Sequence, residues 1–145
     1  MTSKSEFAGT WRLKSYEVRW ANGKVTYPFG ERPEGRLTYS ENGFVSVNIM
    51  ATSRRNFEAR EMKMGTPEEK VAAAETYISY SGRYDLDGDK IKHHVEVCLF
   101  PNWVGKDQVR IFDLNGNTLA LKTIPDPRDE QGRQGYLIWE RVSNS

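Results

Sequence analysis

Cysteine is nearly absent from this chain, and neither sign of charge is in excess. The single Cys98 among 145 residues cannot form a disulfide within the chain, a pattern typical of a reducing compartment. Lys and Arg total 21 and Asp and Glu total 20, so there is no surplus of positive charge for a phosphate backbone. We therefore expect no nucleic-acid partner.

Long hydrophobic runs are also missing. No apolar stretch approaches the roughly 20 residues that a membrane-spanning helix needs. The N-terminal sequence M-T-S-K-S-E has no apolar signal region. We therefore expect no membrane partner and a cytoplasmic location. The length, with 37% hydrophobic residues, suits a single domain over residues 1–145.

Motifs that hold metals or cofactors are absent as well. The only two histidines are adjacent, so on a strand they point to opposite faces and cannot bind one ion. No glycine-rich phosphate loop lies between a strand and a helix. There is no G-x-S-x-G nucleophile elbow. We expect neither a metal nor another cofactor.

Short alternating segments separated by tight turns make up most of the chain. Asn-Gly or Asp-Gly pairs at 22–23, 42–43, 87–88 and 115–116 mark the turns. The expected strands lie near 7–20, 25–27, 36–40, 44–50, 80–86, 89–100, 108–114, 118–123 and 136–142. Eight or nine such strands predict an all-β fold, an up-and-down antiparallel β-barrel that closes to remove its edges. A barrel of eight strands can hold one small ligand.

One helix interrupts the strands, over about residues 67–77. The T-P-E-E sequence at 66–69 supplies an N-cap, a proline at the first helical position and a capping box. Val71, Ala74 and Ile78 recur at helical spacing. We expect this face of the helix to pack on the barrel.

The stretch H-H-V-E-V-C-L-F-P-N-W-V-G contains both histidines. Strand alternation places Ile91, His93, Val95, Val97 and Leu99 on one face and Lys92, His94, Glu96, Cys98 and Phe100 on the other. The first face is apolar, which favours His93 as the inward residue. Burial would lower the pKa of His93 and leave a usable base near neutrality; the alternative is a structural histidine that is hydrogen-bonded in the barrel wall. His94 remains the alternative, because a bulge would exchange the faces.

Arg110 is the candidate cation of the interior. It shares a strand face with Gln108 and Phe112, and the apolar neighbour indicates that this face points inward. A buried guanidinium needs a partner, because an unpaired charge is very costly. A ligand carboxylate, enolate or ketone could fill that role, and the alternatives are an ion pair with Glu96 or Glu140 or simple exposure of Arg110 to solvent.

Further ligand-binding candidates lie on the other strands and at the rim. Ser46 and Asn48 are either polar anchors in a cavity or part of a wet outer face. Trp103 lies in the aromatic turn that ends the histidine strand, where a rim is expected. The complete set of ligand-binding candidates is Tyr39, Ser46, Asn48, Tyr80, Glu96, Phe100, Trp103, Gln108, Phe112 and Trp139.

Residues at both ends of the chain resemble a known group of barrels. F-x-G-x-W at 7–11 resembles the G-x-W signature of the lipocalins, in which an arginine near the C-terminal end packs across the tryptophan. Arg141 is placed for that role on Trp11. Together, G-T-W-R-L, Y-P-F-G-E-R-P-E-G-R-L-T-Y, G-T-P-E-E, the histidine stretch and W-E-R-V resemble bacterial and fungal lipocalin-like domain proteins over nearly the whole chain.

The resemblance implies a ligand cavity and leaves three functions open. The first is a carrier that binds a small apolar, aromatic or polyketide-like molecule. The second adds cofactor-free isomerisation, cyclisation or dehydration, in which His93 or His94 moves a proton while Arg110 and a tyrosine hold an oxygen. The third is a filled barrel that serves as an interaction domain. The oligomeric state, a homodimer included, stays open.

Overall fold

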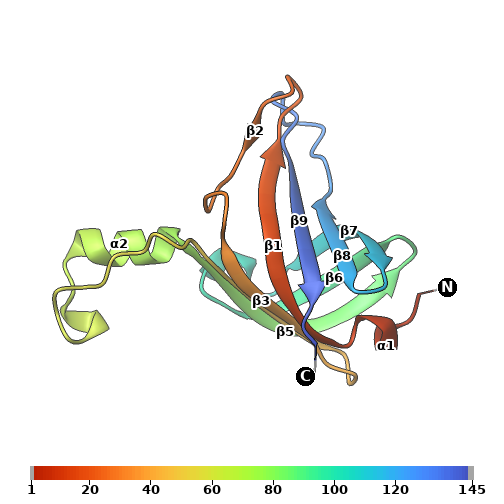
Figure 1. Ribbon diagram of the computed structural model, residues 1–145, viewed down its shortest axis with the longest axis horizontal. Coiled ribbons are helices and arrows are strands. Elements are labelled where there is room, and N and C mark those ends of the chain that lie inside the picture. Colours follow the sequence, from red (N-terminus) through yellow and green to blue (C-terminus); the bar gives the residue numbers. More distant parts are fainter. Residues whose placement is uncertain (1, 144–145) are drawn as a thin grey trace.

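The computed structural model describes residues 2–143 and forms an antiparallel barrel (Figure 1). Its strands are β1 (Gly9–Arg19), β2 (Val25–Thr26), β3 (Glu34–Tyr39), β4 (Phe44–Met50), β5 (Tyr77–Asp87), β6 (Lys90–Cys98), β7 (Asp107–Asn115), β8 (Thr118–Thr123) and β9 (Gln134–Arg141). Neighbours follow the order β2-β1-β3-β4-β5-β6-β7-β8-β9, and a further pairing of β1 with β9 closes every strand except β2 into a ring. The predicted all-β up-and-down barrel is confirmed. Across residues 2–143, no helix has the length and hydrophobicity needed to span a bilayer.

The closing pair of strands is sealed at one end by Arg141. Its guanidinium carbon lies 4.3 Å from the centroid of the Trp11 ring, a contact worth about 1–2 kcal/mol when shielded from water. The same guanidinium donates hydrogen bonds to the carbonyl oxygens of Ala8 at 2.6 Å and Glu6 at 2.7 Å. Arg141 therefore packs on Trp11 as the resemblance implies, and it also ties down the N-terminal segment.

A short helix, α1 (Lys4–Phe7), plugs this end of the barrel. Phe7 is fully buried, with its ring 5.5 Å from that of Tyr39 and 5.0 Å from that of Phe112, both edge-on. Its carbonyl oxygen accepts a 2.9 Å hydrogen bond from Trp11 Nε1. Phe7 thus belongs to the core and precedes the first strand rather than opening it.

The outward face of β4 carries two residues that were candidates for the cavity. Ser46 and Asn48 alternate with the buried Val45, Val47 and Ile49 and therefore point away from the interior. Asn48 accepts hydrogen bonds on that outer face from the hydroxyls of β5, at 3.0 and 3.3 Å. The placement of these two residues as anchors inside the barrel is corrected accordingly.

A β-bulge in β6 decides which residues of the histidine strand face inward. Ser81 of β5 pairs with Val97, whereas Gly82 pairs with Val95, so Glu96 is the extra residue. Before the bulge, His93 and Val95 are buried. Beyond it the faces are exchanged, and Val97 is 68% exposed. The prediction that Val97 and Leu99 share the inward face of His93 is wrong, because the bulge follows both histidines.

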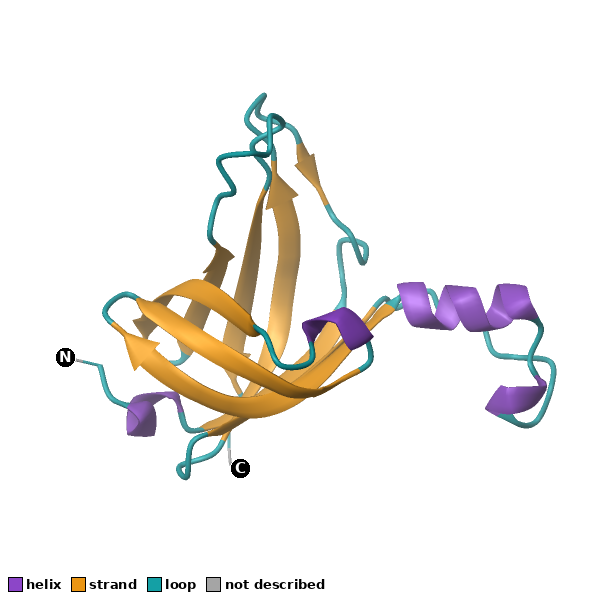
Figure 2. Ribbon diagram, turned by 180° about the vertical axis from the view of Figure 1, so that it is seen from behind, coloured by secondary structure: helices purple, strands orange, loops and turns teal. Residues whose placement is uncertain are grey.

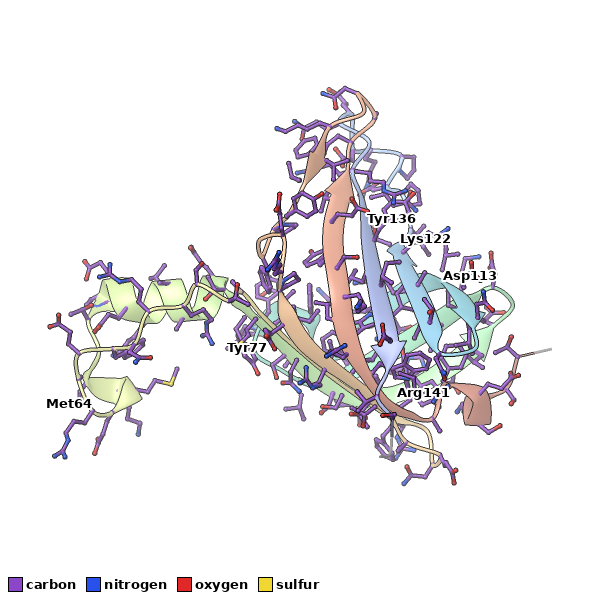
Figure 3. All side chains as sticks on the ribbon, in the orientation of Figure 1. Met64, Tyr77, Asp113, Lys122, Tyr136 and Arg141 are labelled. Carbon is purple, nitrogen blue, oxygen red and sulfur yellow. The ribbon has the colours of Figure 1, made fainter. Side chains whose placement is uncertain are left out.

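The helix α2 (Pro67–Glu75) forms near the predicted position, but it does not pack on the barrel. Its capping box is present, with Glu69 N donating to Thr66 Oγ1 at 3.1 Å and Thr66 N donating to Glu69 Oε1 at 2.8 Å. No residue of α2 is buried. Together with η1 (Met62–Met64), it forms an arm, residues 51–76, that projects away from the strands (Figures 2 and 3).

The arm stays outside because its two ends join neighbouring strands. The chain leaves β4 and returns at β5, which pair directly through Met50 and Tyr77. No strand pairing therefore draws the intervening residues over the barrel. The predicted packing of Val71 on the barrel is wrong, since this side chain is 53% exposed.

Replacing Gly82 with alanine is expected to destabilise the barrel by about 2–4 kcal/mol or to prevent folding. An added Cβ would lie 1.8 Å from the carbonyl oxygen of His94, inside the bulge. Chemical denaturation followed by circular dichroism would measure the loss, with Ser81→Ala as the neighbouring control. A Gly82→Ala protein as stable as that control would contradict the account of the bulge.

Candidate functional site

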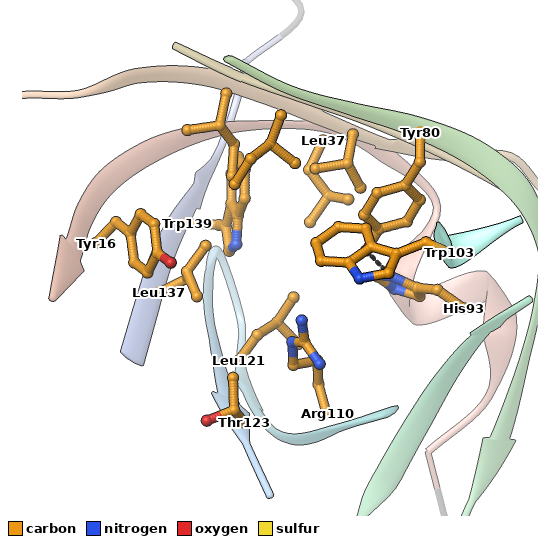
Figure 4. Close-up of a pocket in the computed structure, with 13 residues that line it drawn as sticks. Tyr16, Leu37, Tyr80, His93, Trp103, Arg110, Leu121, Thr123, Leu137 and Trp139 are labelled. Atoms are coloured by element: carbon orange, nitrogen blue, oxygen red, sulfur yellow. Dashed lines mark hydrogen bonds between the residues drawn. The ribbon is translucent and has the colours of Figure 1, made fainter. Parts of the chain in front are cut away.

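A cavity lies inside the barrel, with an empty volume of about 570 Å³ including its open mouth (Figure 4). Its apolar wall consists of Leu37, Val47, Ile49, Ile78, Leu121 and Leu137. The lining side chains with polar atoms are Tyr16, Tyr80, His93, Trp103, Arg110, Thr123 and Trp139. An apolar chamber with a few polar groups is the usual form of a small-molecule site.

His93 sits between two tyrosines in this wall and is 1% exposed. Its Nε2 lies 2.7 Å from the hydroxyl of Tyr39, and its Nδ1 lies 2.6 Å from the hydroxyl of Tyr80. Burial, with a further contribution from the positive charge of Arg110, lowers the pKa of His93 to about 3. The imidazole is therefore neutral and a weak base near neutrality, and its two hydrogen bonds are those expected of a structural histidine in the barrel wall.

The surroundings of Tyr39 determine which way these hydrogen bonds run. A neutral imidazole has one donor and one acceptor nitrogen. Within residues 2–143, His93 is the one hydrogen-bond partner of the fully buried Tyr39 hydroxyl, so Tyr39 must donate to Nε2 or leave its proton unsatisfied. Nδ1 then carries the hydrogen and donates to Tyr80. The hydroxyl proton of Tyr80, a lining residue, is left free for the cavity.

Arg110 of β7 extends into the same chamber (Figure 4). Its Nη1 donates to the carbonyl oxygen of Val109 at 2.9 Å, and its Nη2 donates to Gln108 Oε1 at 3.1 Å. Neither predicted acid pairs with it, because Glu96 is exposed at the bulge and Glu140 lies near Arg12 and Lys14 on the outer face. Among the residues described here, no carboxylate forms an ion pair with Arg110.

Trp139 of β9 presents an unusual donor. The side chain is 1% exposed, and its Nε1 has no hydrogen-bond partner within residues 2–143. A buried N–H without an acceptor costs about 1–3 kcal/mol. This nitrogen is therefore a donor without an acceptor in a side chain that lines the cavity.

His94 points to the outside. Its Nδ1 lies 2.7 Å from an Asp107 oxygen and its Nε2 lies 2.9 Å from an Asp85 oxygen. These hydrogen bonds, that to Asp107 first, raise the pKa of His94. The assignment of His94 to the cavity is corrected, since the bulge that would have turned it inward follows it in the strand.

Some of the other candidates hold a lining residue in place, and the rest lie on the surface of the protein. Gln108 positions Arg110, Tyr39 positions His93, and Phe112 packs against the plug beneath the chamber. Glu96 is exposed at the bulge, and Phe100 is 49% exposed, with its ring 5.6 Å from that of Trp103. Glu96 and Phe100 do not line the cavity.

Across residues 2–143, no group of three or more His, Cys, Asp or Glu side chains is placed to hold a metal ion.

Several lining residues were missing from the sequence-based set. Leu37, Val47 and Ile49 could have been found from the strict alternation of β3 and β4. Tyr16 could not, because a bulge between Leu13 and Ser15 shifts the register of β1 against β9. Without that shift, alternation from Trp11 and Leu13 would point Tyr16 outward.

Comparison with known proteins places this geometry in a family. Residues 8–142 match the lipocalin-like domain family, and the chain belongs to it. A curated relative is the "4'-hydroxy-3'-methoxypropiophenone carrier protein ppsC" of Aspergillus oryzae (strain ATCC 42149 / RIB 40). It is 29% identical over 108 residues, which cover 68% of this chain and 96% of the relative. Family and relative together support small-molecule binding.

His93 and His94 should affect the pH dependence of the free energy of unfolding in opposite directions. Below pH 6.5, the ordinary pKa of histidine, the unfolded chain protonates His93 while the folded barrel does not. The free energy of unfolding therefore decreases as the pH is lowered, by up to about 1.4 kcal/mol per pH unit. His94 has a raised folded pKa, so its contribution is complete below 6.5 and is lost as pH rises through the folded value.

Urea denaturation of His93→Gln and His94→Gln at several pH values would separate the two effects. Between about pH 6 and pH 5, His93→Gln should lose most of the slope that the unsubstituted protein shows, and His94→Gln should retain it. Above about pH 7, only His94→Gln should lack the decline. Equal slopes for both variants below pH 6 would contradict the burial of a neutral His93.

Proposed function

We propose that this protein binds and carries a small aromatic molecule that bears oxygen acceptors. The observation that carries the proposal is the Nε1 of Trp139, which has no hydrogen-bond partner within residues 2–143; Trp139 lines a mainly apolar chamber together with Arg110 and Tyr80. Rings fit the leucine, isoleucine and valine wall, while oxygens match the donors. The relative's printed ligand, a phenolic ketone, has this combination of features.

Carriage fits the site better than catalysis does. An isomerase or dehydratase needs a base whose pKa lies near the working pH. The lining contains no carboxylate, and both nitrogens of His93 are engaged by tyrosines. Arg110 and Tyr80 could polarise a carbonyl, but a partner that removes the proton is not among the lining residues of the chamber.

Binding can be tested with 4'-hydroxy-3'-methoxypropiophenone by isothermal titration calorimetry. Leu137→Trp places a larger side chain in the cavity wall and should weaken binding by about tenfold or more. Leu99→Trp makes the same exchange at a position that is 48% exposed outside the cavity and should leave binding unchanged. Circular dichroism would establish that both variants fold.

The same experiment tests carriage against conversion. After prolonged incubation, chromatography and mass spectrometry should recover the ketone unchanged. Equal affinity for the two tryptophan variants would place the ligand outside the barrel. A new product that requires the protein would replace the carrier proposal with an enzymatic one.

A further inference from the structure

The side chains that line the cavity offer more hydrogen-bond donors than acceptors, and this imbalance bears on the ionisation of the ligand. Trp139 Nε1 donates only and has no partner within residues 2–143. Arg110 also donates only, and two of its five N–H groups are accounted for by Val109 and Gln108. Tyr80 supplies a third donor once Tyr39 and His93 have oriented their hydrogen bonds.

Acceptors within the chamber are few: they are the hydroxyl oxygens of Tyr16, Tyr80 and Thr123 and the ring nitrogens of His93. Both ring nitrogens of His93 face tyrosine hydroxyls. Thr123 Oγ1 accepts a 2.8 Å hydrogen bond from the backbone nitrogen of Gly135. The lining includes no aspartate or glutamate. A neutral phenol placed beside the donors would therefore have few acceptors for its own O–H, at a cost of about 1–3 kcal/mol.

The charges that face the cavity favour an anion. The titratable lining groups are Tyr16 of β1, Tyr80 of β5, His93 of β6 and Arg110 of β7. Burial raises the pKa of Tyr16 and takes that of Tyr80 to about 12, so these hydroxyls keep their protons, while His93 stays neutral. Arg110 is thus the one charged group of the lining, and an anionic oxygen would neutralise it.

We propose that the cavity selects the deprotonated form of its ligand, a phenol made acidic by a conjugated carbonyl group, through Arg110, Trp139 Nε1 and the Tyr80 hydroxyl. In such a phenolate the negative charge is shared between the phenolic and the carbonyl oxygens, so both ends accept hydrogen bonds and neither donates. This selection rests on the proposed function and adds the chemical state in which the aromatic molecule is held.

The test uses two probes, 4'-hydroxyacetophenone and its methyl ether 4'-methoxyacetophenone, which cannot ionise. Absorbance spectra of the hydroxy probe, free and with saturating protein, give its pKa in each state, because the phenolate absorbs at longer wavelength. The bound pKa should lie at least about one unit below the free value, which corresponds to about tenfold tighter binding of the anion. The hydroxy probe should also gain affinity with rising pH, whereas the methyl ether should not.

Arg110→Met removes the charge but keeps a long apolar side chain. It should abolish the shift in the bound pKa and weaken the hydroxy probe by about tenfold, with little effect on the methyl ether. Arg36→Met is the matched control, because Arg36 also donates to the carbonyl of the preceding residue but is exposed on β3. Trp139→Phe deletes the free N–H and should reduce the shift without abolishing it.

The outcomes separate the two proposals. If both probes bind equally well and the bound pKa is unchanged or raised, anion selection is overturned while the carrier function stands. If the shift persists in Arg110→Met, the assignment to Arg110 is overturned. If neither probe binds, the proposed function fails and anion selection fails with it.

Discussion

The pairing of β1 with β9 is the contact on which the rest of this molecule depends. It joins the two ends of the meander, from Trp11 opposite Arg141 to Arg19 opposite Gln134. Closure brings the β9 side chains Leu137 and Trp139 across from the β6 and β7 side chains, so that one chamber is lined from many strands. The plug of α1 under Trp11 fills the end where the strands meet. Without closure, the wall of the chamber would be one face of an open sheet.

The polar side chains of the barrel interior form two layers, one that lines the cavity and one behind it. Tyr39 and Gln108 lie behind the cavity, and each satisfies the residue in front of it, His93 and Arg110 respectively. This support orients the imidazole and the guanidinium without introducing a carboxylate, while burial keeps the imidazole neutral. The result is an interior that is positively charged and rich in donors, although the chain as a whole is nearly neutral.

Alternation along the strands predicted much of the architecture and part of the site. It placed Arg110 inward on β7, it favoured His93 over His94, and it brought Trp139 into the candidate set. It failed where one extra residue reverses the faces, at Glu96 in β6 and between Leu13 and Ser15 in β1. A bulge is specified by contacts with the neighbouring strand, such as the space at Gly82, and these contacts do not appear in the pattern of a single strand. The free N–H of Trp139 likewise emerges only once the barrel is assembled.

The arm has a thermodynamic consequence of its own. Its hydrogen bonds are largely internal, as between Arg54 and the end of α2 or between Glu58 N and Glu69, and Met62 and Met64 are about 70% exposed. Local unfolding of this segment would expose little buried apolar surface and break no rung of the β4–β5 ladder. Limited proteolysis would accordingly cut the chain here first and leave the two fragments held together by strand pairing. Insertions or deletions at the tip would change little beyond loop-closure entropy, at about 0.6 kcal/mol for each doubling of length.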